Sequence, residues 1–282
     1  MSKEQASALP DDVSASVRIA LDEDIGSGDV TASLVAPGAT ITASVWCREC
    51  AVLCGVNWFD EVFRQLHPGI VVQWRAGDGD GVQENSIVCT VTGPAAPILT
   101  GERTAINFLQ LLSGTATTAR RYASVLADSS TQVLDTRKTL PGLRRAQKYA
   151  VLCGGCHNHR IGLFDAVLIK DNHIANAGSI TKVVAAARSG NPDLTIEVEV
   201  KDLAELDEAL SAGSDVVMLD NFPRTDIGEA VARSRGRAKL EISGNVALED
   251  LAELASTGVD YISVGALTKN VRAIDFSMRF DD

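Results

Sequence analysis

The chain has 282 residues, of which 45% are apolar and 22% charged, and its formal net charge at pH 7 is −11. These values are ordinary for a globular protein with one or two domains, and no run approaches the ~18 apolar residues of a membrane span. A pI near 4.9 argues against nucleic acid as a general partner. The first residues, MSKEQASALPDD, lack the apolar core of a secretory signal, so we expect a cytoplasmic protein without a membrane partner.

The six cysteines are expected to be free thiols in a reducing compartment. Two spacings indicate alternatives. Cys153-Gly-Gly-Cys156-His157 fits covalent haem attachment, which normally requires export. Cys47-x2-Cys50 together with Cys153-x2-Cys156 would complete a four-thiolate zinc site if the two segments met in space. Both alternatives stay open at this point.

The first part of the chain has the pattern of an α+β domain with an antiparallel sheet. The expected helices are 11–22, capped by an aspartate, and 57–66, and the expected strands lie in 40–56, 70–74 and 86–91. Between them, the loop EDIGSGDVTASLV combines acidic residues with glycine, which is typical of a turn.

A long helix is expected to begin near Gly101, after Pro94 and Pro97, in the stretch GERTAINFLQLLSGTATTARRYASVL. Arg103 would then lie in its first turn, where the helix dipole disfavours a cation. We therefore expect Arg103 to point at an anion across a boundary.

From residue 131 onward, apolar strands alternate with helices, as in parallel βαβ units. The expected strands are QVLDT, DAVLIK, TIEVEV, DVVMLD, AKLEIS and YISVG, and the helices between them include 179–189, 202–212 and 248–256. An incomplete barrel of about six or seven parallel strands is the first choice, and an open doubly wound sheet is the second. No GxGxxG follows the first strand, which disfavours an open doubly wound sheet that binds a dinucleotide.

Cations gather in the middle of this acidic chain. Between residues 137 and 173, seven cations face two carboxylates, a local charge of +5: Arg137, Lys138, Arg144, Arg145, Lys148, Arg160 and Lys170 against Asp165 and Asp171. Such a segment indicates an anionic ligand. A solvated helix face is the alternative explanation for the three cations of residues 144–148.

The six strands share polar or small residues at their C-terminal ends, where the site of an α/β barrel lies. Period-2 alternation puts Glu197 and Glu199 on one face of their strand, and Glu241 likewise shares a face with Ser243. We assign Glu197 and Glu241 to a structural ion-pair network, with Lys138 and Lys170 as available partners. Glu199 and Asp220, nearest the mouth, are assigned to a ligand. The glycine-bearing loops SGNV and VGALTK fit a phosphate.

Six segments resemble the quinolinate phosphoribosyltransferase family: GERTAINFLQLLSG, LDTRKTLPGLRRAQKYAV, GGCHNHRIGLFDAVLIKDNHI, VMLDNF, LEISGNV and YISVGALTK. The resemblance runs in order from EDIGSGDVT to SMRF. It implies an N-terminal α/β sandwich domain (1–115), an incomplete C-terminal barrel (116–269), and a return of 270–282 to the first domain. It also implies a homodimer, without excluding a higher oligomer, and phosphoribosyl transfer from phosphoribosyl pyrophosphate (PRPP) to quinolinate. The products would be nicotinate mononucleotide, CO₂ and pyrophosphate, in NAD biosynthesis.

The resemblance also implies roles for individual residues. Arg137, His159, Arg160 and Lys170 would hold the quinolinate carboxylates, with Arg103 reaching in from the partner subunit. Lys138, Glu199 and Asp220 would be the catalytic group that handles PRPP, with Mg²⁺ held by the two acids directly or through water. The remaining substrate contacts would come from Thr136, Ser243, Gly244, Asn245, Gly265, Ala266 and Leu267.

Two positions depart from the family pattern, because Asn245 and Asn270 stand where many members have glycine and some have histidine, respectively. The nearest alternative function is a related barrel phosphoribosyltransferase with another acceptor, such as the homologue found with molybdate-transport genes. Non-enzymatic sensing of PRPP or phosphate, and zinc or haem binding, are alternatives from other classes.

Overall fold

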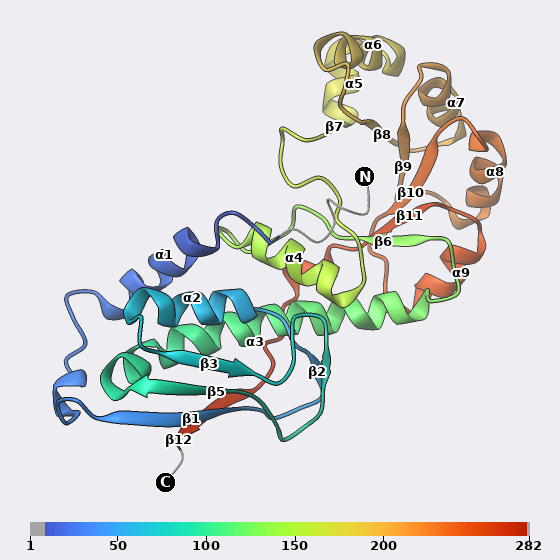
Figure 1. The fold of residues 1–282 in the computed structure, drawn as a ribbon. Coiled ribbons are helices and arrows are strands. Elements are labelled where there is room, and N and C mark those ends of the chain that lie inside the picture. The colour runs from blue at the N-terminus through green and yellow to red at the C-terminus, as the bar shows by residue number, and fades with distance from the viewer. Residues whose placement is uncertain (1–8, 281–282) are drawn as a thin grey trace. The chain divides into compact units, whose positions relative to one another are not determined.

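The computed structural model describes residues 9–280, which form two compact units (Figure 1). The first unit contains residues up to Arg121, Thr139–Gly155 and the segment from Leu267 onward. The second contains Tyr122–Lys138 and Cys156–Ala266. Each unit is therefore assembled from segments that are distant in the sequence.

The first unit is an antiparallel sheet covered by helices. Its four-stranded sheet has the order β12-β1-β5-β3, with β1(Thr40–Cys47), β3(Val71–Trp74), β5(Ser86–Pro94) and β12(Phe276–Phe280). A second, two-stranded sheet pairs β2(Ala51–Val52) with β4(Gly81–Val82). Its other elements are α1(Val13–Ile25), η1(Ala32–Leu34), α2(Val56–Leu66), α3(Ala95–Val125), α4(Arg144–Gly154) and α10(Ala266–Lys269), of which α3 and α10 cross the unit boundary. The predicted antiparallel sheet is confirmed.

Apolar residues of α2 form the centre of this core, as the 3.6-residue period predicts. Trp58, Phe59, Val62 and Phe63 are almost fully buried, and the Phe59 ring packs edge-on against Trp74 with centroids 5.1 Å apart. Removing this aromatic surface from water stabilises the first unit.

The helix α3 begins earlier than the sequence predicted. It starts at Ala95 rather than near Gly101, because Pro97 lies in the first turn, where no intrahelical N–H is required. Arg103 therefore lies in the third turn, exposed, and the argument from an unfavourable helix start was wrong. The assignment of Arg103 to an anionic substrate is therefore supported only by the resemblance to the family.

The loop before β1 is tied to α3 by Asp29. One carboxylate oxygen of Asp29 accepts hydrogen bonds from the backbone N–H groups of Thr31 and Ala32, and the other accepts from the Thr100 hydroxyl at 2.7 Å. The Thr31 hydroxyl also donates to Asp29, at 2.7 Å, and this bond, followed by the others, lowers the pKa of Asp29 to about 2. The family-like sequence EDIGSGDVT thus has a structural use that its composition did not reveal.

The cations of α4 do not form a uniformly solvated face. Arg145 is ion-paired with Asp11 at 2.5 Å, which connects α4 to the residues before α1. Lys148, by contrast, is 2% exposed. The prediction of a solvated face is wrong for Lys148, because the helical period placed it on the side that packs inward.

The second unit is built on a six-stranded, wholly parallel sheet of order β6-β11-β10-β9-β8-β7. Its strands are β6(Gln132–Leu134), β7(Val167–Ile169), β8(Ile196–Val200), β9(Val216–Asp220), β10(Lys239–Ser243) and β11(Tyr261–Ser263). The two edge strands, β6 and β7, are not paired with each other. The incomplete parallel barrel is therefore confirmed.

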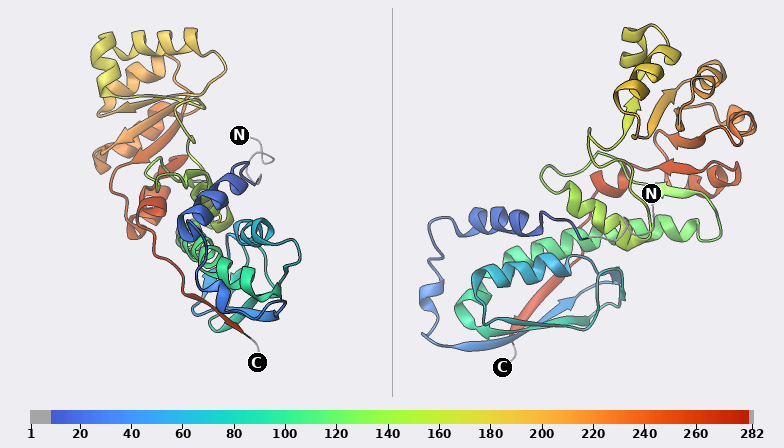
Figure 2. Two further views of the ribbon diagram at one scale, coloured as in Figure 1. Left: turned by 90° about the vertical axis from the view of Figure 1, so that its left-hand side faces the viewer. Right: turned by 45° about the horizontal axis from the view of Figure 1, so that its top comes forward.

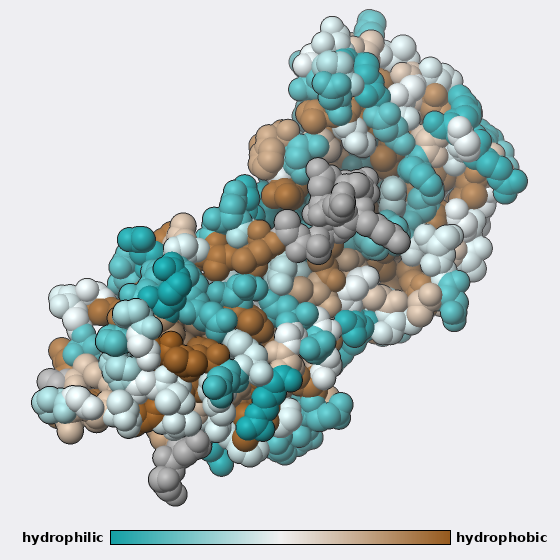
Figure 3. Space-filling model, in the orientation of Figure 1, coloured by the Kyte–Doolittle hydropathy of each residue, from teal (hydrophilic) through white to brown (hydrophobic). Residues whose placement is uncertain are grey.

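Helices cover one face of this sheet in all views (Figure 2). They are α5(Asp171–Ala177), α6(Ile180–Gly190), α7(Leu203–Ser211), α8(Arg224–Ser234), η2(Leu248–Asp250) and α9(Leu251–Ser256). Figure 3 shows hydrophilic side chains gathered over α7 and α8, as expected for the outer layer of a barrel. Among residues 9–280, no helix is both long and apolar enough to cross a lipid bilayer.

Candidate active site

Polar side chains line the face of the second sheet that the helices leave free. On β8, the apolar residues Ile196, Val198 and Val200 are fully buried and alternate with Glu197 and Glu199. The pairing register places Glu199 beside Met218 and therefore on the same face as Asp220, two residues further along β9. Period-2 alternation thus brings the two acids that the sequence singled out to one end of neighbouring strands.

The ends of β6 and β11 bring together Thr136, Lys138 and Gly265. The Thr136 hydroxyl accepts a hydrogen bond from the Lys138 backbone N–H at 3.1 Å. A Cβ atom on Gly265 would lie 3.1 Å from Cδ of Lys138. Glycine therefore leaves room for the Lys138 side chain to lie across the end of β11.

The segment that carries His159 and Arg160 is held beside β6. His157 forms a parallel bridge with Leu134, and the buried Asp135 carboxylate accepts a hydrogen bond from the His159 backbone N–H at 2.9 Å. Sequence reasoning missed Asp135. The available signal was an acidic residue directly after the apolar residues of a strand.

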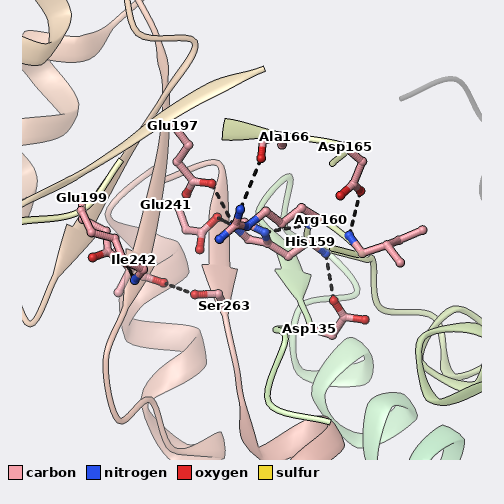
Figure 4. A network of polar contacts seen from close by, with 12 residues as sticks. Asp135, His159, Arg160, Asp165, Ala166, Glu197, Glu199, Glu241, Ile242 and Ser263 are labelled. Carbon is pink, nitrogen blue, oxygen red and sulfur yellow. Dashed lines mark hydrogen bonds and ion pairs between the residues drawn. The ribbon is translucent and has the colours of Figure 1, made fainter. Parts of the chain in front are cut away.

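A buried cluster joins His159 to two glutamates (Figure 4). His159 Nε2 lies 2.9 Å from Glu197 Oε2 and 3.5 Å from Glu241 Oε2. The other oxygen of each carboxylate is buried and finds no hydrogen-bond partner among residues 9–280. Glu197 and Glu241 thus share one buried polar network, but the partner is His159 through hydrogen bonding, where ion pairing with lysine was expected.

The protonation of this cluster follows from its hydrogen bonds. His159 Nδ1 accepts from the Arg160 backbone N–H at 2.7 Å, so the ring proton lies on Nε2 and is donated to Glu197. Burial, followed by the charge of Glu197, raises the pKa of Glu241 to about 8. At neutral pH, Glu241 therefore holds a proton, which avoids two adjacent buried negative charges.

His159, Glu197 and Glu241 also have the donor types of a metal site, with ligand atoms within 4.8 Å of one another. A histidine that binds a metal through one nitrogen usually donates the other N–H. Nδ1 of His159 instead accepts a bond, so the geometry favours a proton-holding cluster over a cation site. The thiols of the CxxC pairs do not form a comparable group within the part of the chain that the structure describes.

Arg160 and Arg137 lie close enough to interact. Burial lowers the pKa of Arg160, and the charge of Arg137 lowers it further. Arg160 donates to the Ala166 carbonyl at 3.3 Å, in a loop that Asp165 closes by accepting from the N–H groups of Ile161 and Gly162. Two neighbouring guanidinium groups favour a multiply charged anion, which relieves their repulsion.

Lys170 and Glu199 form an ion pair across the ends of β7 and β8. Lys170 was expected as a partner of Glu197 or Glu241, but its partner is Glu199, the glutamate assigned to a ligand. Glu199 and Asp220 are only partly buried and offer carboxylate oxygens, the ligands that Mg²⁺ prefers. Their donor chemistry and position at the open end therefore fit the ion.

A small hollow of about 70 Å³ lies beside the loop Ser243, Gly244 and Asn245. Gly244 has φ +112° and Asn245 has φ +41°, conformations that turn the chain sharply after β10. Such turns expose backbone N–H groups, as a phosphate requires. Ala266 begins α10, whereas the side chain of Leu267 is buried, which leaves its backbone for any ligand contact.

Comparison with known proteins gives the family of this site. The models of the N- and C-terminal domains of quinolinate phosphoribosyl transferase match residues 29–113 and 115–279. The chain belongs to the quinolinate phosphoribosyltransferase family. A carboxylating nicotinate-nucleotide pyrophosphorylase of Mycobacterium leprae is 42% identical over 93% of this chain and 95% of its own. The nicotinate-nucleotide pyrophosphorylase structure from Francisella tularensis has 46% identity and a TM-score of 0.94, with 98% and 99% of the two chains covered.

Within this quinolinate phosphoribosyltransferase fold, the predicted site residues divide between the units. Arg103 and Leu267 belong to the first unit, and the others belong to the second. Sequence reasoning missed the contact of His159 with Glu197 and Glu241, because residues distant in the chain give no local signal of their pairing. The inward alternation of both glutamates was the one available indication.

Proposed function

We propose that this protein transfers the phosphoribosyl group of PRPP to quinolinate and releases CO₂ and pyrophosphate to give nicotinate mononucleotide. The observation that carries this proposal is the juxtaposition of Arg137 with Arg160 beside the Lys170–Glu199 pair, at the open end of a family barrel. Quinolinate is a dianion, and PRPP is a phosphorylated sugar. One end of the sheet thus offers cations for the first and acids with a phosphate loop for the second. We place the reaction in the cytoplasm.

The arginines position the acceptor. Arg137 and Arg160 bind the quinolinate carboxylates, with Lys170 completing the cationic set. Both ring nitrogens of His159 are engaged by Glu197 and by the Arg160 backbone N–H, so in this proposal His159 fixes the backbone beside Arg160 and does not itself hold a carboxylate. Orientation of this kind lowers the entropic cost of attack by the pyridine nitrogen.

Acidic residues stabilise the donor. Bound Mg²⁺ would neutralise the departing pyrophosphate, with Glu199 and Asp220 holding the ion directly or through water. Lys138 binds a pyrophosphate oxygen, and the carboxylates stabilise positive charge at C1 of the ribose. The pyridine nitrogen forms the new bond to C1 as the bond between C1 and the pyrophosphate oxygen breaks, and pyrophosphate leaves intact. The resulting pyridinium accepts the electron pair released when the C2 carboxylate leaves as CO₂, and a solvent proton then replaces it.

We also propose that the active form is a homodimer in which Arg103 completes the site of the partner subunit. A mixture of Arg103→Ala and Arg137→Ala subunits tests this directly. Mixed dimers contain one site with both arginines intact, so activity should reappear on mixing although each variant alone is nearly inactive. Failure to recover any activity in verified mixed dimers would contradict a shared site.

The reaction itself is tested by incubating purified protein with PRPP and Mg²⁺ and either quinolinate or nicotinate. Consumption of quinolinate alone, with equal amounts of CO₂ and pyrophosphate, is the expected result. Turnover of neither acceptor by folded protein would move the function to another acceptor or to a sensor. The name of the Mycobacterium leprae relative described above, which refers to the carboxylating reaction, favours quinolinate.

A further inference from the structure

Asn221 adopts an unusual conformation directly after Asp220 at the end of β9. Its φ is +50°, a left-handed value that asparagine tolerates better than most residues with a side chain. Backbone strain of this kind persists when surrounding contacts hold it in place. Asn221 has three such contacts.

The first contact joins two neighbouring strand ends, and the second lies within the end of β9. The backbone N–H of Asn221 donates to the carbonyl of Ser243 at 3.1 Å, which connects the end of β9 to the end of β10. The side-chain amide donates to Asp220 Oδ1 at 3.2 Å. Asn221 therefore restrains the carboxylate that we assign to the ribose or Mg²⁺.

The third contact supports the loop that we assign to phosphate. The amide oxygen of Asn221 lies 2.4 Å from the position that a Cβ atom would occupy on Gly244. The loop backbone thus rests directly on the Asn221 side chain, and only glycine fits there. Asn221 and the loop residues also line the hollow of about 70 Å³.

We propose that Asn221 is a positioning residue that sets the spacing between the Asp220 carboxylate and the phosphate loop, and so matches the site to the length of PRPP. A single amide touches both halves of the donor site, one through its nitrogen and the other through its oxygen. The proposal rests on the proposed function, because it assumes that these halves bind the two ends of PRPP. Asn221 itself need not touch the substrate.

The test replaces Asn221 by glycine, which keeps the left-handed backbone but removes the amide. The Michaelis constant for PRPP should rise about tenfold or more, the range for loss of a hydrogen bond to a charged group. The Michaelis constant for quinolinate should stay within about twofold. Asn85→Gly is the matched control, since Asn85 has a similar φ of +57° but lies in the first unit, beside β5.

A role confined to backbone shape predicts wild-type kinetics for Asn221→Gly, and that result in a folded variant would overturn the proposal. Equal increases in the Michaelis constants for PRPP and quinolinate would overturn the proposal as well. Should the glycine variant unfold, Asn221→Asp carries the test. It keeps the shape but faces Asp220 with a like charge, so the PRPP constant should rise further. Absence of turnover in the wild-type protein would instead refute the proposed function.

Discussion

The ammonium group of Lys170 is ion-paired with the carboxylate of Glu199, across the ends of two adjacent parallel strands. The resemblance assigns these residues to different substrates, Lys170 to quinolinate and Glu199 to PRPP with Mg²⁺. Each residue is therefore the ion-pair partner of a group assigned to the other substrate. If quinolinate binds Lys170 as proposed, its carboxylate competes with Glu199 for the ammonium group.

Glu199→Gln should separate the competition of Glu199 for Lys170 from the proposed role of Glu199 in binding PRPP. Without PRPP, quinolinate should bind about two- to fivefold more tightly, because a partly exposed ion pair that competes for Lys170 is worth up to about 1 kcal/mol. Turnover should nevertheless fall, because the acid assigned to PRPP is lost. Calorimetric titration and steady-state kinetics measure the two quantities. Weaker quinolinate binding by the variant would show that the pair helps to preorganise Lys170 instead.

Arg137→Lys should lower kcat/KM for quinolinate by roughly 10- to 100-fold. Lysine keeps the charge but cannot form the two parallel hydrogen bonds that a guanidinium makes with a carboxylate. Steady-state kinetics at saturating PRPP provides the measurement. Arg235→Lys, in an exposed residue at the end of α8, is the matched control and should leave the rate unchanged. Wild-type-like kcat/KM for Arg137→Lys would remove Arg137 from the acceptor site.

Glu241 should make stability depend on pH in a defined window. Its pKa is raised from 4.5 to about 8 in the folded protein, so the folded state binds the proton more tightly than the unfolded state. This contribution is fully present below pH 4.5 and is lost as the pH rises through about 8. Relative to Glu241→Gln, the free energy of unfolding of the wild type should therefore decline over that interval.

Urea unfolding of the wild type and Glu241→Gln at about pH 5, 6.5 and 8.5 would measure the difference between their free energies of unfolding across this pH interval. Glu249→Gln, in an exposed glutamate, is the control and should follow the wild type at each pH. Parallel curves for the wild type and Glu241→Gln would contradict a protonated Glu241.

Gly154→Ala should destabilise the first unit by about 1 to 3 kcal/mol, as overpacking does. An added Cβ would lie 2.4 Å from Cβ of Ala119 and 2.5 Å from the carbonyl of Ala116, where α4 crosses α3. Thermal or urea unfolding would report the loss. Gly190→Ala at the end of α6 is the control, because its Cβ would meet nothing within 4 Å and alanine favours a helix. Equal effects of the two changes would refute close packing at Gly154.

Local patterns in the sequence determined the elements and the kind of site. Short apolar runs that alternate with helical stretches predicted all six parallel strands, because parallel strands need helical crossovers between them. Parallel strands end at one edge, so the polar residues that follow each strand had to gather there. That argument predicted the neighbourhood of Glu199 and Asp220 without any knowledge of packing.

Only the tertiary structure decided which side chains pair. Glu197 and Glu241 were expected near lysines but contact His159, and Lys148 was expected in solvent but is buried. Asn221 showed no sequence signal beyond its place after a strand, yet it supports both Asp220 and Gly244. The contacts of His159 with Glu197 and of Asn221 with Gly244 join segments separated by tens of residues, and such partners are chosen by register and close packing, which a local pattern does not encode.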